Sequence, residues 1–554
     1  MILVSQEKIK EYTEKGFWGT KTLLDLFKEN VAANKERLAL VDPPNRGEFT
    51  NQAPERITYE DLSKRVDALA TSLMNRGIGK DDIVQVQLPN IWELTLVYMA
   101  IARVGAIFTP MPVQWRAHEF GYINRITKAK MFITVERFHG FKHTEMAWQM
   151  QPDLPHLKHL LTLEEVREMS LGEAHSSKLD AILVDADDIL TLCWSSGTES
   201  NPKGCPMSHN NWFSQGGIIN NALDSDLDHE IILCIAPMVN MTGVGVGFIL
   251  WLLTGGTVVF HHPLDVEMVI QQILDEGVTR TIFVPAVLNI LLKHPKVDQF
   301  DLSSVDSILT GSAPPSAWSL REFQRRWGIE IACAWGQTEG TAIMVGPKDI
   351  PDIEKRVCMF PDWGDKSREW PIKGIETKLV DPMTNEVVTK VGQIGQMAYK
   401  GPNVFPGYYK SPDINERSFD DEDFFYTGDL FKLEGDGFFS FFDRCKDIII
   451  RGGINISAQE VENMLLAHPK VLDVAAVGMP DEVLGERTCV YVVPRDRNDV
   501  LDIKGLVEYM KEKGLATYKL PERMEQVDII PRNPVGKILK SELRKDITAK
   551  LRAE

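Results

Sequence analysis

The sequence predicts a chain of mixed α/β and α+β class, with a large N-terminal domain of α/β sheets, a β-rich subdomain and a small α+β domain at the C-terminus. Apolar stretches alternate between helical and strand-like patterns along residues 59–111 and again along 279–316, which is typical of βαβ units and a parallel sheet. After about Leu379 the pattern changes to short strands and turns. At 554 residues the chain is also too long for a single core.

The first alternating stretch begins with an amphipathic helix over residues 59–76, which ends at Gly77. The strand-like IVQVQ, the helical IWELTLVYMAIARVG and the strand-like AIFTPM follow in that order. We therefore expect a parallel sheet in this region, because a helix connects each strand to the next. The apolar positions of the first helix are Leu62, Val66, Leu69 and Leu73.

A long uncharged stretch runs from Ile231 to Phe260. Its length alone would suggest a membrane-spanning helix. However, it contains Pro237, Asn240 and five glycines, and it divides into strand-like IILCIAP, helical VGFILWLLT and strand-like TVVF. We therefore expect a buried strand, loop, helix and strand.

The C-terminal part of the sequence reads as a separate compact unit. A helix is predicted around AQEVENMLLAHP, two strands at VLDVAAVG and TCVYVVP, and a second helix around IKGLVEYMKEKG. This unit has the size of a small α+β domain. We place the boundary near Asp443 to Lys446 and predict two domains, 1–442 and 443–554.

Composition and charge exclude several classes of protein. A formal charge of -18 argues against a nucleic-acid partner, because the phosphate backbone would be repelled and no basic patch stands out. The seven cysteines are scattered singly, which predicts neither a zinc site nor a disulfide framework and suggests a reducing, cytoplasmic location. The first residues lack the continuous apolar region of a secretion signal.

The run WSSGTESNPKG, from Trp194 to Gly204, is typical of a phosphate-binding loop. Hydroxyls and exposed N–H groups donate hydrogen bonds to phosphate oxygens, glycine allows close approach, and lysine brings a positive charge. It is not a Walker loop, since Pro202 precedes the lysine. Alone, such a run is more often an ordinary surface loop. The candidate residues are Ser195, Ser196, Gly197, Thr198 and Lys203.

Further segments complete the same chemistry in a fixed order. GSAPPS follows at Gly311, AWGQTEGT at Ala334, YTGDL at Tyr426 and DRCKDIIIRGGINISAQEVE at Asp443, and NPVGKILK closes the chain. In this order the set resembles the adenylate-forming superfamily of acyl-CoA synthetases, peptide-synthetase adenylation domains and beetle luciferases. It is most similar to bacterial short- to medium-chain fatty acyl-CoA synthetases, through SGTE, GPNVFPGYY, DIIIRGGINIS and DEVLGERTCVYVV.

This resemblance implies that the chain activates a carboxylic acid with ATP. The acid's carboxylate attacks the α-phosphate, so two anions meet and the site must supply positive charge. The resemblance assigns that charge to Lys537, which would bridge the carboxylate and the phosphate. Glu339 would hold Mg²⁺, a cation that prefers oxygen ligands. Thr198 is grouped with these two as catalytic.

The resemblance also assigns the nucleotide contacts. Asp429 and Arg444 would bind the ribose hydroxyls, since a carboxylate accepts two neighbouring O–H groups well. Trp335 would stack on adenine, where relatives commonly carry tyrosine. The remaining nucleotide-binding residues implied are Ser312, Ala313, Pro314, Ala334, Gly336, Gln337 and Thr338.

A mobile C-terminal domain follows from the same resemblance. Lys446 would be the hinge about which this domain turns after adenylation, and Gly453 would line a tunnel for the pantetheine arm of CoA. A GGxN run could instead be a tight hairpin turn. Gly311, Asn240 and Met241 are assigned to the acid and CoA.

Two departures from the family pattern stand out. Glu199 and Ser200 replace residues usual in the phosphate loop; a glutamate facing phosphate would cost on the order of 4 kcal/mol, so we expect Glu199 to face away or to pair with Lys203 or Arg280. Asn240 stands where relatives carry histidine or an aromatic residue, so it could read a polar group on the substrate or position water. Met241, Val244 and Met344 make that neighbourhood apolar, which favours a hydrocarbon acid.

The sequence thus predicts an ATP-dependent, AMP-forming acid:CoA ligase that uses Mg²⁺, with CoA as second substrate and a medium-chain fatty acid as first. Aryl or alicyclic acids are the alternative, because KGFW and LLDLF near the start resemble aryl-acid-activating members. Transfer to a carrier protein, a luciferase-like oxygenase and a regulator without catalysis are the further alternatives. A homodimer and peripheral contact with a membrane are left open.

Overall fold

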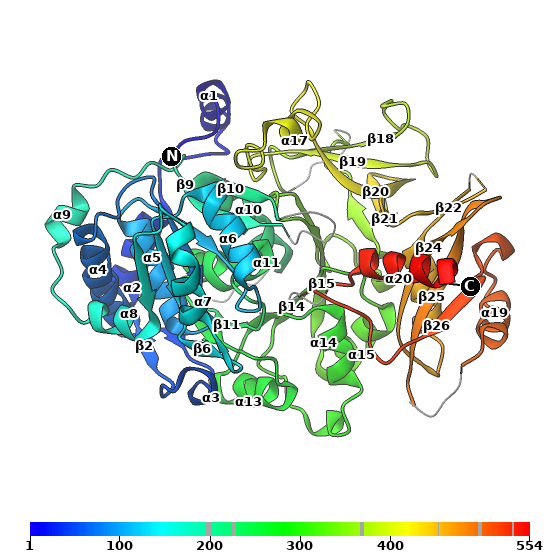
Figure 1. Ribbon diagram of the computed structural model, residues 1–554, viewed down its shortest axis with the longest axis horizontal. Helices are drawn as coiled ribbons and strands as arrows, with labels where there is room; N and C mark the ends of the chain where they lie inside the picture. Colours follow the sequence, from blue (N-terminus) through cyan, green and yellow to red (C-terminus); the bar gives the residue numbers. More distant parts are fainter. Residues whose placement is uncertain are drawn as a thin grey trace.

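The computed structural model describes residues 1–195, 202–223, 229–365, 371–452, 454–496, 501–533 and 537–553 (Figure 1). Two large sheets and the helices around them form the left and centre of the view, and a β-rich layer and a small C-terminal domain form the upper and right parts. The helices before the uncharged stretch are α1 (Gln6–Glu14), α2 (Leu23–Asn34), α3 (Gly47–Thr50), α4 (Tyr59–Asn75), α5 (Trp92–Arg103), α6 (Ala117–Thr127), α7 (His143–Met150), α8 (Leu163–Ser170), α9 (Ser176–Asp180) and α10 (His209–Leu223).

The first sheet has eight strands and a parallel centre. Only its edges are antiparallel, at the pairs β16 with β15 and β1 with β2. Its order is β16 (Ala342–Val345), β15 (Glu330–Gly336), β14 (Ser307–Thr310), β13 (Arg280–Ile282), β11 (Ile231–Cys234), β12 (Thr257–Phe260), β1 (Leu38–Val41) and β2 (Arg56–Thr58).

The second sheet has six strands, and only β10 runs against its neighbour. Its order is β10 (Gly204–Ser208), β9 (Ile189–Trp194), β4 (Ile107–Pro110), β3 (Ile83–Gln87), β5 (Met131–Thr134) and β8 (His159–Thr162). Strands β6 (Arg137–Phe138) and β7 (Phe141–Lys142) form a separate pair. Both predicted parallel sheets are therefore confirmed.

One hydrophobic cluster joins the two sheets, since it includes Val84 and Phe108 of the second sheet and Ile232 and Val258 of the first.

Every residue of α5 is buried, which agrees with a helix that is apolar on all sides. The predicted helix over 91–105 is thus confirmed, with bounds that differ by one or two residues.

The uncharged stretch folds as predicted. β11 and β12 are neighbours in the first sheet, and between them lie α11 (Met241–Val244), the π-helical turn η2 (Gly245–Ile249) and α12 (Leu250–Thr254). None of the helices in the described ranges combines the length and apolar character that crossing a membrane requires. The later helices of the large domain are α13 (Val266–Glu276), α14 (Pro285–Leu292), α15 (Ala317–Trp327), α16 (Ile353–Arg356) and α17 (Pro412–Glu416).

The β-rich subdomain is a five-stranded antiparallel sheet that lies above the first sheet in Figure 1. It brings Asp429 and Arg444 opposite each other on neighbouring strands. Its order is β17 (Met359–Pro361), β21 (Phe438–Arg444), β20 (Phe425–Gly435), β19 (Ile394–Lys400) and β18 (Glu376–Val380).

The C-terminal domain has a core of its own. Two clusters of buried side chains are built from residues between Ile449 and Ile547, whereas the buried residues of the two largest clusters end at Phe425 and Phe439. The predicted fold class, with a large N-terminal and a smaller C-terminal domain, is confirmed; the dividing residue 443 stays a prediction. Its elements are β22 (Ile449–Arg451), β23 (Ile454–Ile456), α18 (Ala458–Leu466), β24 (Val471–Asp481), β25 (Gly485–Pro494), α19 (Ile503–Glu512), β26 (Arg523–Gln526) and α20 (Lys540–Ala553).

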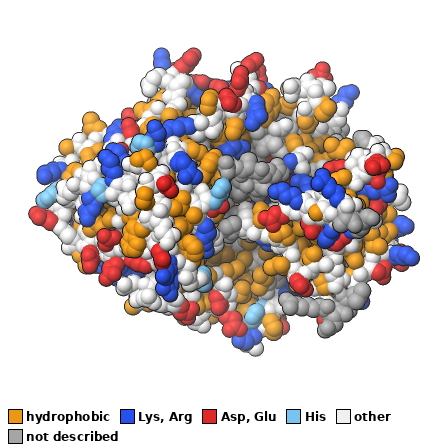
Figure 2. Space-filling view, viewed as in Figure 1, with side chains coloured by type: hydrophobic (Ala, Val, Ile, Leu, Met, Phe, Trp, Pro, Cys, Tyr) orange, Lys and Arg blue, Asp and Glu red, His pale blue; other side chains and the backbone are white. Residues whose placement is uncertain are grey.

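Acidic and basic side chains are interspersed over the face shown in Figure 2, and Lys and Arg gather most densely over α20. Three of its cations form ion pairs: Lys540 lies 2.8 Å from Glu462, Arg544 lies 2.7 Å from Asp447, and Lys550 lies 2.8 Å from Glu525. Part of the positive charge on α20 is therefore neutralised within the C-terminal domain.

Candidate active site

The predicted phosphate loop connects β9 and β10, which pair in antiparallel register. Two hydrogen bonds join Ser195 and Lys203 at the base of the loop. The Ser195 N–H donates to the Lys203 carbonyl at 2.9 Å, and the Lys203 N–H donates to the Ser195 hydroxyl at 3.0 Å. Ser196, Gly197 and Thr198 lie outside the described residues, as do Glu199 and Ser200. The expected pairing of Glu199 therefore stays a prediction.

Glu339 lies in the tight turn between β15 and β16. The Tyr408 hydroxyl donates to its Oε1 at 2.6 Å, and its backbone carbonyl accepts from the Phe405 N–H at 3.0 Å. The turn requires glycine at position 340, because φ is +89° there and a Cβ would lie 2.1 Å from the Asn403 carbonyl oxygen. The carboxylate is thus held at a fixed place, 8% exposed.

The predicted ribose pair is assembled by the β-rich subdomain. Asp429 is buried, and its Oδ2 accepts from the Trp335 indole N–H at 2.8 Å and from the Gln337 amide at 3.1 Å. Its Oδ1 lies 3.6 Å from Arg444 Nε. Trp335 was predicted only to stack on adenine, so its hydrogen bond to the carboxylate is a contact that sequence reasoning missed.

The predicted adenine segment follows β14, next to the end of β15. The two strands run parallel, so their carboxyl ends bring Gly311 and Ala334 together. A Cβ at Gly311 would lie 2.8 Å from the Ala334 carbonyl oxygen, so a larger residue would push the strands apart. Ser312 has φ of +71°, a strained conformation outside glycine that occurs often at functional sites. The residues brought to this edge are Gly311, Ser312, Ala313, Pro314, Ala334, Trp335, Gly336, Gln337 and Thr338.

Lys537 is half-buried and lies in a hairpin in which the Asn533 N–H donates to the Lys537 carbonyl at 2.8 Å. Its pKa is lowered to about 7, first by burial and then by the positive charges of Arg444 and Lys446, while Asp429 and Asp447 oppose this shift. The charges of Asp429 and Arg444 act on this amine, so the C-terminal domain places it in the neighbourhood of the predicted ribose pair. The sequence alone could not locate it there.

The segment around the predicted hinge makes hydrogen bonds on both sides of Lys446. On the earlier side, Asp443 Oδ2 accepts from the Ser457 hydroxyl at 2.9 Å and from the Gln459 N–H at 3.1 Å, at the start of α18. On the later side, Arg544 donates to Asp447 Oδ1 at 2.7 Å, and it also donates to the carbonyl of Lys446 itself at 2.8 Å. Gly453 lies outside the described residues, so its predicted place in a tunnel is not located.

Asn240 has a structural role that its sequence position did not reveal. It caps α11, because its Oδ1 accepts from the Gly243 N–H at 3.0 Å. Gly243 is packed so closely that a Cβ would lie 1.9 Å from the Pro237 carbonyl oxygen. Met241, next in sequence, is buried. The turn therefore has little freedom, and the helix cap uses the side-chain oxygen of Asn240 rather than its nitrogen.

Tyr408 is the functional residue that sequence reasoning missed most clearly. It belongs to the motif GPNVFPGYY, which in the sequence indicates only the family resemblance. Nothing in the spacing of that motif indicates that the Tyr408 hydroxyl, in the segment after β19, contacts Glu339 in the turn after β15.

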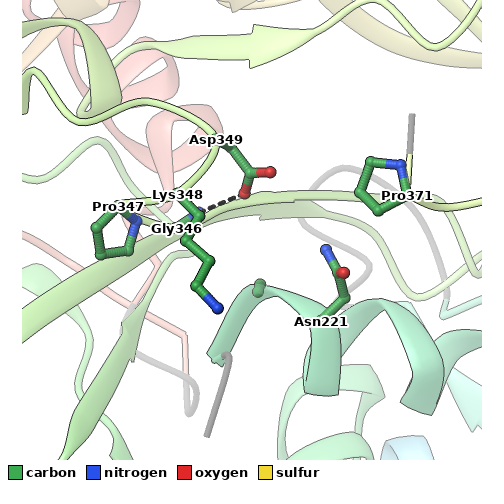
Figure 3. A pocket seen from close by; sticks show the side chains of 7 residues that line it. Asn221, Gly346, Pro347, Lys348, Asp349 and Pro371 are labelled. Atoms are coloured by element: carbon green, nitrogen blue, oxygen red, sulfur yellow. Dashed lines mark hydrogen bonds between the residues drawn. The ribbon is translucent and has the colours of Figure 1, made fainter. Parts of the chain in front are cut away.

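A surface cavity of about 210 Å³ lies at the other end of β16, where α10 ends (Figure 3). Its wall includes Asn221 and Lys348, and the Gly346 N–H donates to Asp349 beside it at 2.8 Å. None of the predicted site residues lines this cavity. It is therefore separate from the strand ends that carry Gly311 and Ala334.

Polar groups at the ends of parallel strands, a loop closed at a lysine and a half-buried lysine from a second domain define an enzyme that acts on a nucleotide. Residues 27–409 match the family model of AMP-binding enzymes, and residues 460–537 match that of the AMP-binding enzyme C-terminal domain. The medium-chain fatty-acid–CoA ligase of Escherichia coli (strain K12) is 30% identical over 99% of this chain and 94% of its own.

The 2,3-dihydroxybenzoate-AMP ligase of Bacillus subtilis (strain 168) is 31% identical over 99% of this chain and 97% of its own. A solved structure of O-succinylbenzoate coenzyme A synthetase from Bacillus subtilis, in complex with ATP and a magnesium ion, has a TM-score of 0.77 and 24% identity, covering 94% of this chain and 98% of that one. The chain belongs to the family of AMP-binding enzymes, and it is an adenylate-forming ligase. The resemblance to this superfamily is thereby confirmed.

Proposed function

We propose that this ligase activates a medium-chain fatty acid in two steps and transfers it to CoA. The carboxylate attacks the α-phosphate of ATP to give acyl-AMP and pyrophosphate, and the CoA thiol then displaces AMP. The observation that carries the proposal is that Lys537 lies close enough to Asp429 and Arg444 for their charges to act on it, because an amine from the C-terminal domain is then in the neighbourhood of the residues proposed to hold the ribose. Its ammonium form would neutralise the charge that develops between carboxylate and phosphate.

Mg²⁺ fits the residues present. Glu339 offers a hard oxygen ligand, one oxygen of which is held by Tyr408. Over the described residues no cluster of three metal-binding side chains occurs, which suits an ion held mainly by phosphate oxygens, water and one carboxylate. When bound, Mg²⁺ neutralises negative charge on the phosphates. Lys203 would then bind the phosphate oxygens from the base of the loop.

A panel of acids tests the proposal. Pyrophosphate release and acyl-CoA formation are measured with straight-chain acids of increasing length, aryl acids and alicyclic acids, each with and without CoA. We expect the highest kcat/KM with medium-chain acids and thioester only when CoA is present. Release of pyrophosphate with no thioester formed would favour loading of a carrier protein, and no acyl-AMP with any acid would overturn the proposal.

Aryl acids are the second candidate, favoured by Asn240. Its Oδ1 is taken by the helix cap, so its amide N–H₂ group remains to donate to a ring hydroxyl or carbonyl. The similarity to the 2,3-dihydroxybenzoate-AMP ligase supports the same alternative. If kcat/KM were higher for hydroxylated aryl acids than for octanoate, aryl acids and not fatty acids would be the substrate class.

Seven free cysteines support the proposed reducing, cytoplasmic location.

Residues 443–554 are proposed as the mobile domain, with Lys446 as the hinge. Asp443 is the first residue of this range but precedes the hinge residue, so a turn at Lys446 would leave it with the N-terminal domain and its bonds to Ser457 and Gln459 would cross the hinge. These bonds would exist only while the C-terminal domain holds Lys537 near Asp429.

Replacing Asp443 with asparagine is expected to slow acyl-AMP formation about tenfold, because a charge-assisted hydrogen bond becomes a neutral one. Thioester formation from supplied acyl-AMP should be unchanged or faster, since that step would use the other position of the domain. Single-turnover kinetics of the two steps provide the measurement. Equal slowing of both steps would show that Asp443 moves with the C-terminal domain.

The pKa of Lys537 leads to a prediction about protons. In the free protein this amine loses its proton as the pH rises through about 7. Bound phosphate favours the ammonium form and raises the pKa, so nucleotide binding near pH 8 is expected to take up about one proton, and binding near pH 6 almost none. Calorimetry in buffers of different ionisation enthalpy measures the uptake. A Lys537→Met variant that takes up protons equally would contradict the assignment.

A further inference from the structure

Tyr408 is held rigidly at the junction of the two predicted charged groups of the site. Its side chain is 5% exposed, and its ring packs edge-on against Phe405 with centroids 4.9 Å apart. Its backbone N–H donates to Asn415 Oδ1 at 2.7 Å, and the Asn415 amide donates back to its carbonyl at 3.0 Å. The ring therefore has one defined position, and so does its hydroxyl.

The hydroxyl of Tyr408 contacts the proposed metal ligand. It donates to Glu339 Oε1 at 2.6 Å, a short hydrogen bond of the kind that a carboxylate accepts. The hydroxyl is the donor in this bond, because an ionised carboxylate can only accept. A carboxylate held on one oxygen is oriented with its other oxygen still available.

The face of the same ring contacts the proposed phosphate ligand. Lys203 Nζ lies 4.1 Å from the ring centroid, within the range of a cation–π interaction. The following residue, Tyr409, donates its N–H to the Gly204 carbonyl at 2.9 Å, which attaches this segment to the end of the loop. One tyrosine thus contacts an anion with its edge and a cation with its face.

The Tyr408 side chain contacts both the positive charge of Lys203 and the negative charge of Glu339, and it keeps these two groups apart. Among the described residues no ion pair joins Lys203 to Glu339. A direct pair would occupy the free carboxylate oxygen and the ammonium at once, and both groups would then have to be freed before a metal–nucleotide complex could bind. The ring gives each group a weaker partner that leaves it available.

We propose that Tyr408 is a positioning residue that orients Glu339 toward Mg²⁺ and Lys203 toward the polyphosphate, and keeps the two from pairing with each other. The inference rests on the proposed function, since it assigns a role toward the same metal and nucleotide. It goes beyond that function because Tyr408 is proposed to contact neither Mg²⁺ nor the nucleotide and to act through Glu339 and Lys203, which would bind them.

The test uses the full-length protein and the non-hydrolysable analogue α,β-methylene-ATP, titrated calorimetrically with and without Mn²⁺. Tyr408→Phe removes only the hydroxyl and keeps the ring under Lys203. We expect it to weaken binding with Mn²⁺ about tenfold, the usual effect of removing a partner of a metal ligand, and to leave binding without metal unchanged. Tyr408→Leu removes the ring as well, and we expect it to weaken binding in both conditions.

Tyr59→Phe is the matched control, because it also deletes a buried hydroxyl, one that donates to the Gly256 carbonyl at 2.8 Å. We expect it to bind the analogue as the wild type does. If Tyr408→Phe keeps the full advantage that Mn²⁺ gives the wild type, the inference is overturned while the proposed function stands. If the wild type itself binds no better with Mn²⁺ than without, the metal site of the proposed function fails instead.

Discussion

The Lys537→Ala variant is expected to form acyl-AMP about two to three orders of magnitude more slowly than the wild type, by analogy with the loss of one donor that stabilises a transition state. The amine is half-buried and close enough to Asp429 and Arg444 for their charges to act on it, so the variant removes a charge from the neighbourhood of the proposed ribose pair. Pyrophosphate release under single-turnover conditions measures this step. The second step, thioester formation from supplied acyl-AMP, should be largely unaffected, because it would use another position of the C-terminal domain.

Lys511→Ala serves as the control for this variant, since Lys511 is an exposed lysine of the same domain on α19. We expect it to retain wild-type rates in both steps. If Lys537→Ala lost both steps to the same extent, the two steps would share one arrangement of the domains, and the turning of the C-terminal domain would have to be abandoned.

The Glu339→Gln variant is expected to lose about two orders of magnitude in the rate of acyl-AMP formation at millimolar Mg²⁺, comparable to the loss of one electrostatic contact to the transition state. Glutamine has nearly the same size and can still accept the Tyr408 hydrogen bond, so the turn should fold as before. What is lost is the negative charge that attracts the cation. The rate should recover in part as Mg²⁺ is raised.

Pyrophosphate release measured over a range of Mg²⁺ concentrations tests this expectation. Glu386→Gln, at an exposed position in the turn before β19, is the control and should behave as the wild type. An unchanged Mg²⁺ dependence in Glu339→Gln would show that the metal is held elsewhere, and the charge proposed for Glu339 would then need another explanation.

The fold could be predicted from the sequence wherever a local pattern of residues was compatible with only one kind of local structure. The alternation around β3, α5 and β4 required a parallel sheet, and the uncharged stretch at Ile231 could not be a membrane helix because Pro237 and the glycines interrupt it. Its division into strand, helix and strand followed from the same interruption. These are short-range effects, which a sequence records directly.

The site could be predicted only as a set of residues, because its geometry depends on contacts between distant segments. Trp335 and Gln337 orient Asp429 across about a hundred positions of sequence, and no local pattern encodes such a contact. Tyr408 was missed for the same reason, since its hydroxyl meets an acid from another strand end. Asn240 was noticed as unusual, but its part in capping α11 became visible only with the backbone of Gly243 in place.

The close packing at Gly243 limits how the specificity of this ligase can be redesigned. A methyl group there would overlap the Pro237 carbonyl, so mutant libraries that randomise this turn would consist mostly of misfolded proteins. Variation at Met241 and Met344 leaves the backbone of the turn intact, because neither residue is a glycine held against a neighbouring carbonyl. Engineering of the accepted acid should therefore begin with those two methionines, which belong to the proposed acid-binding neighbourhood.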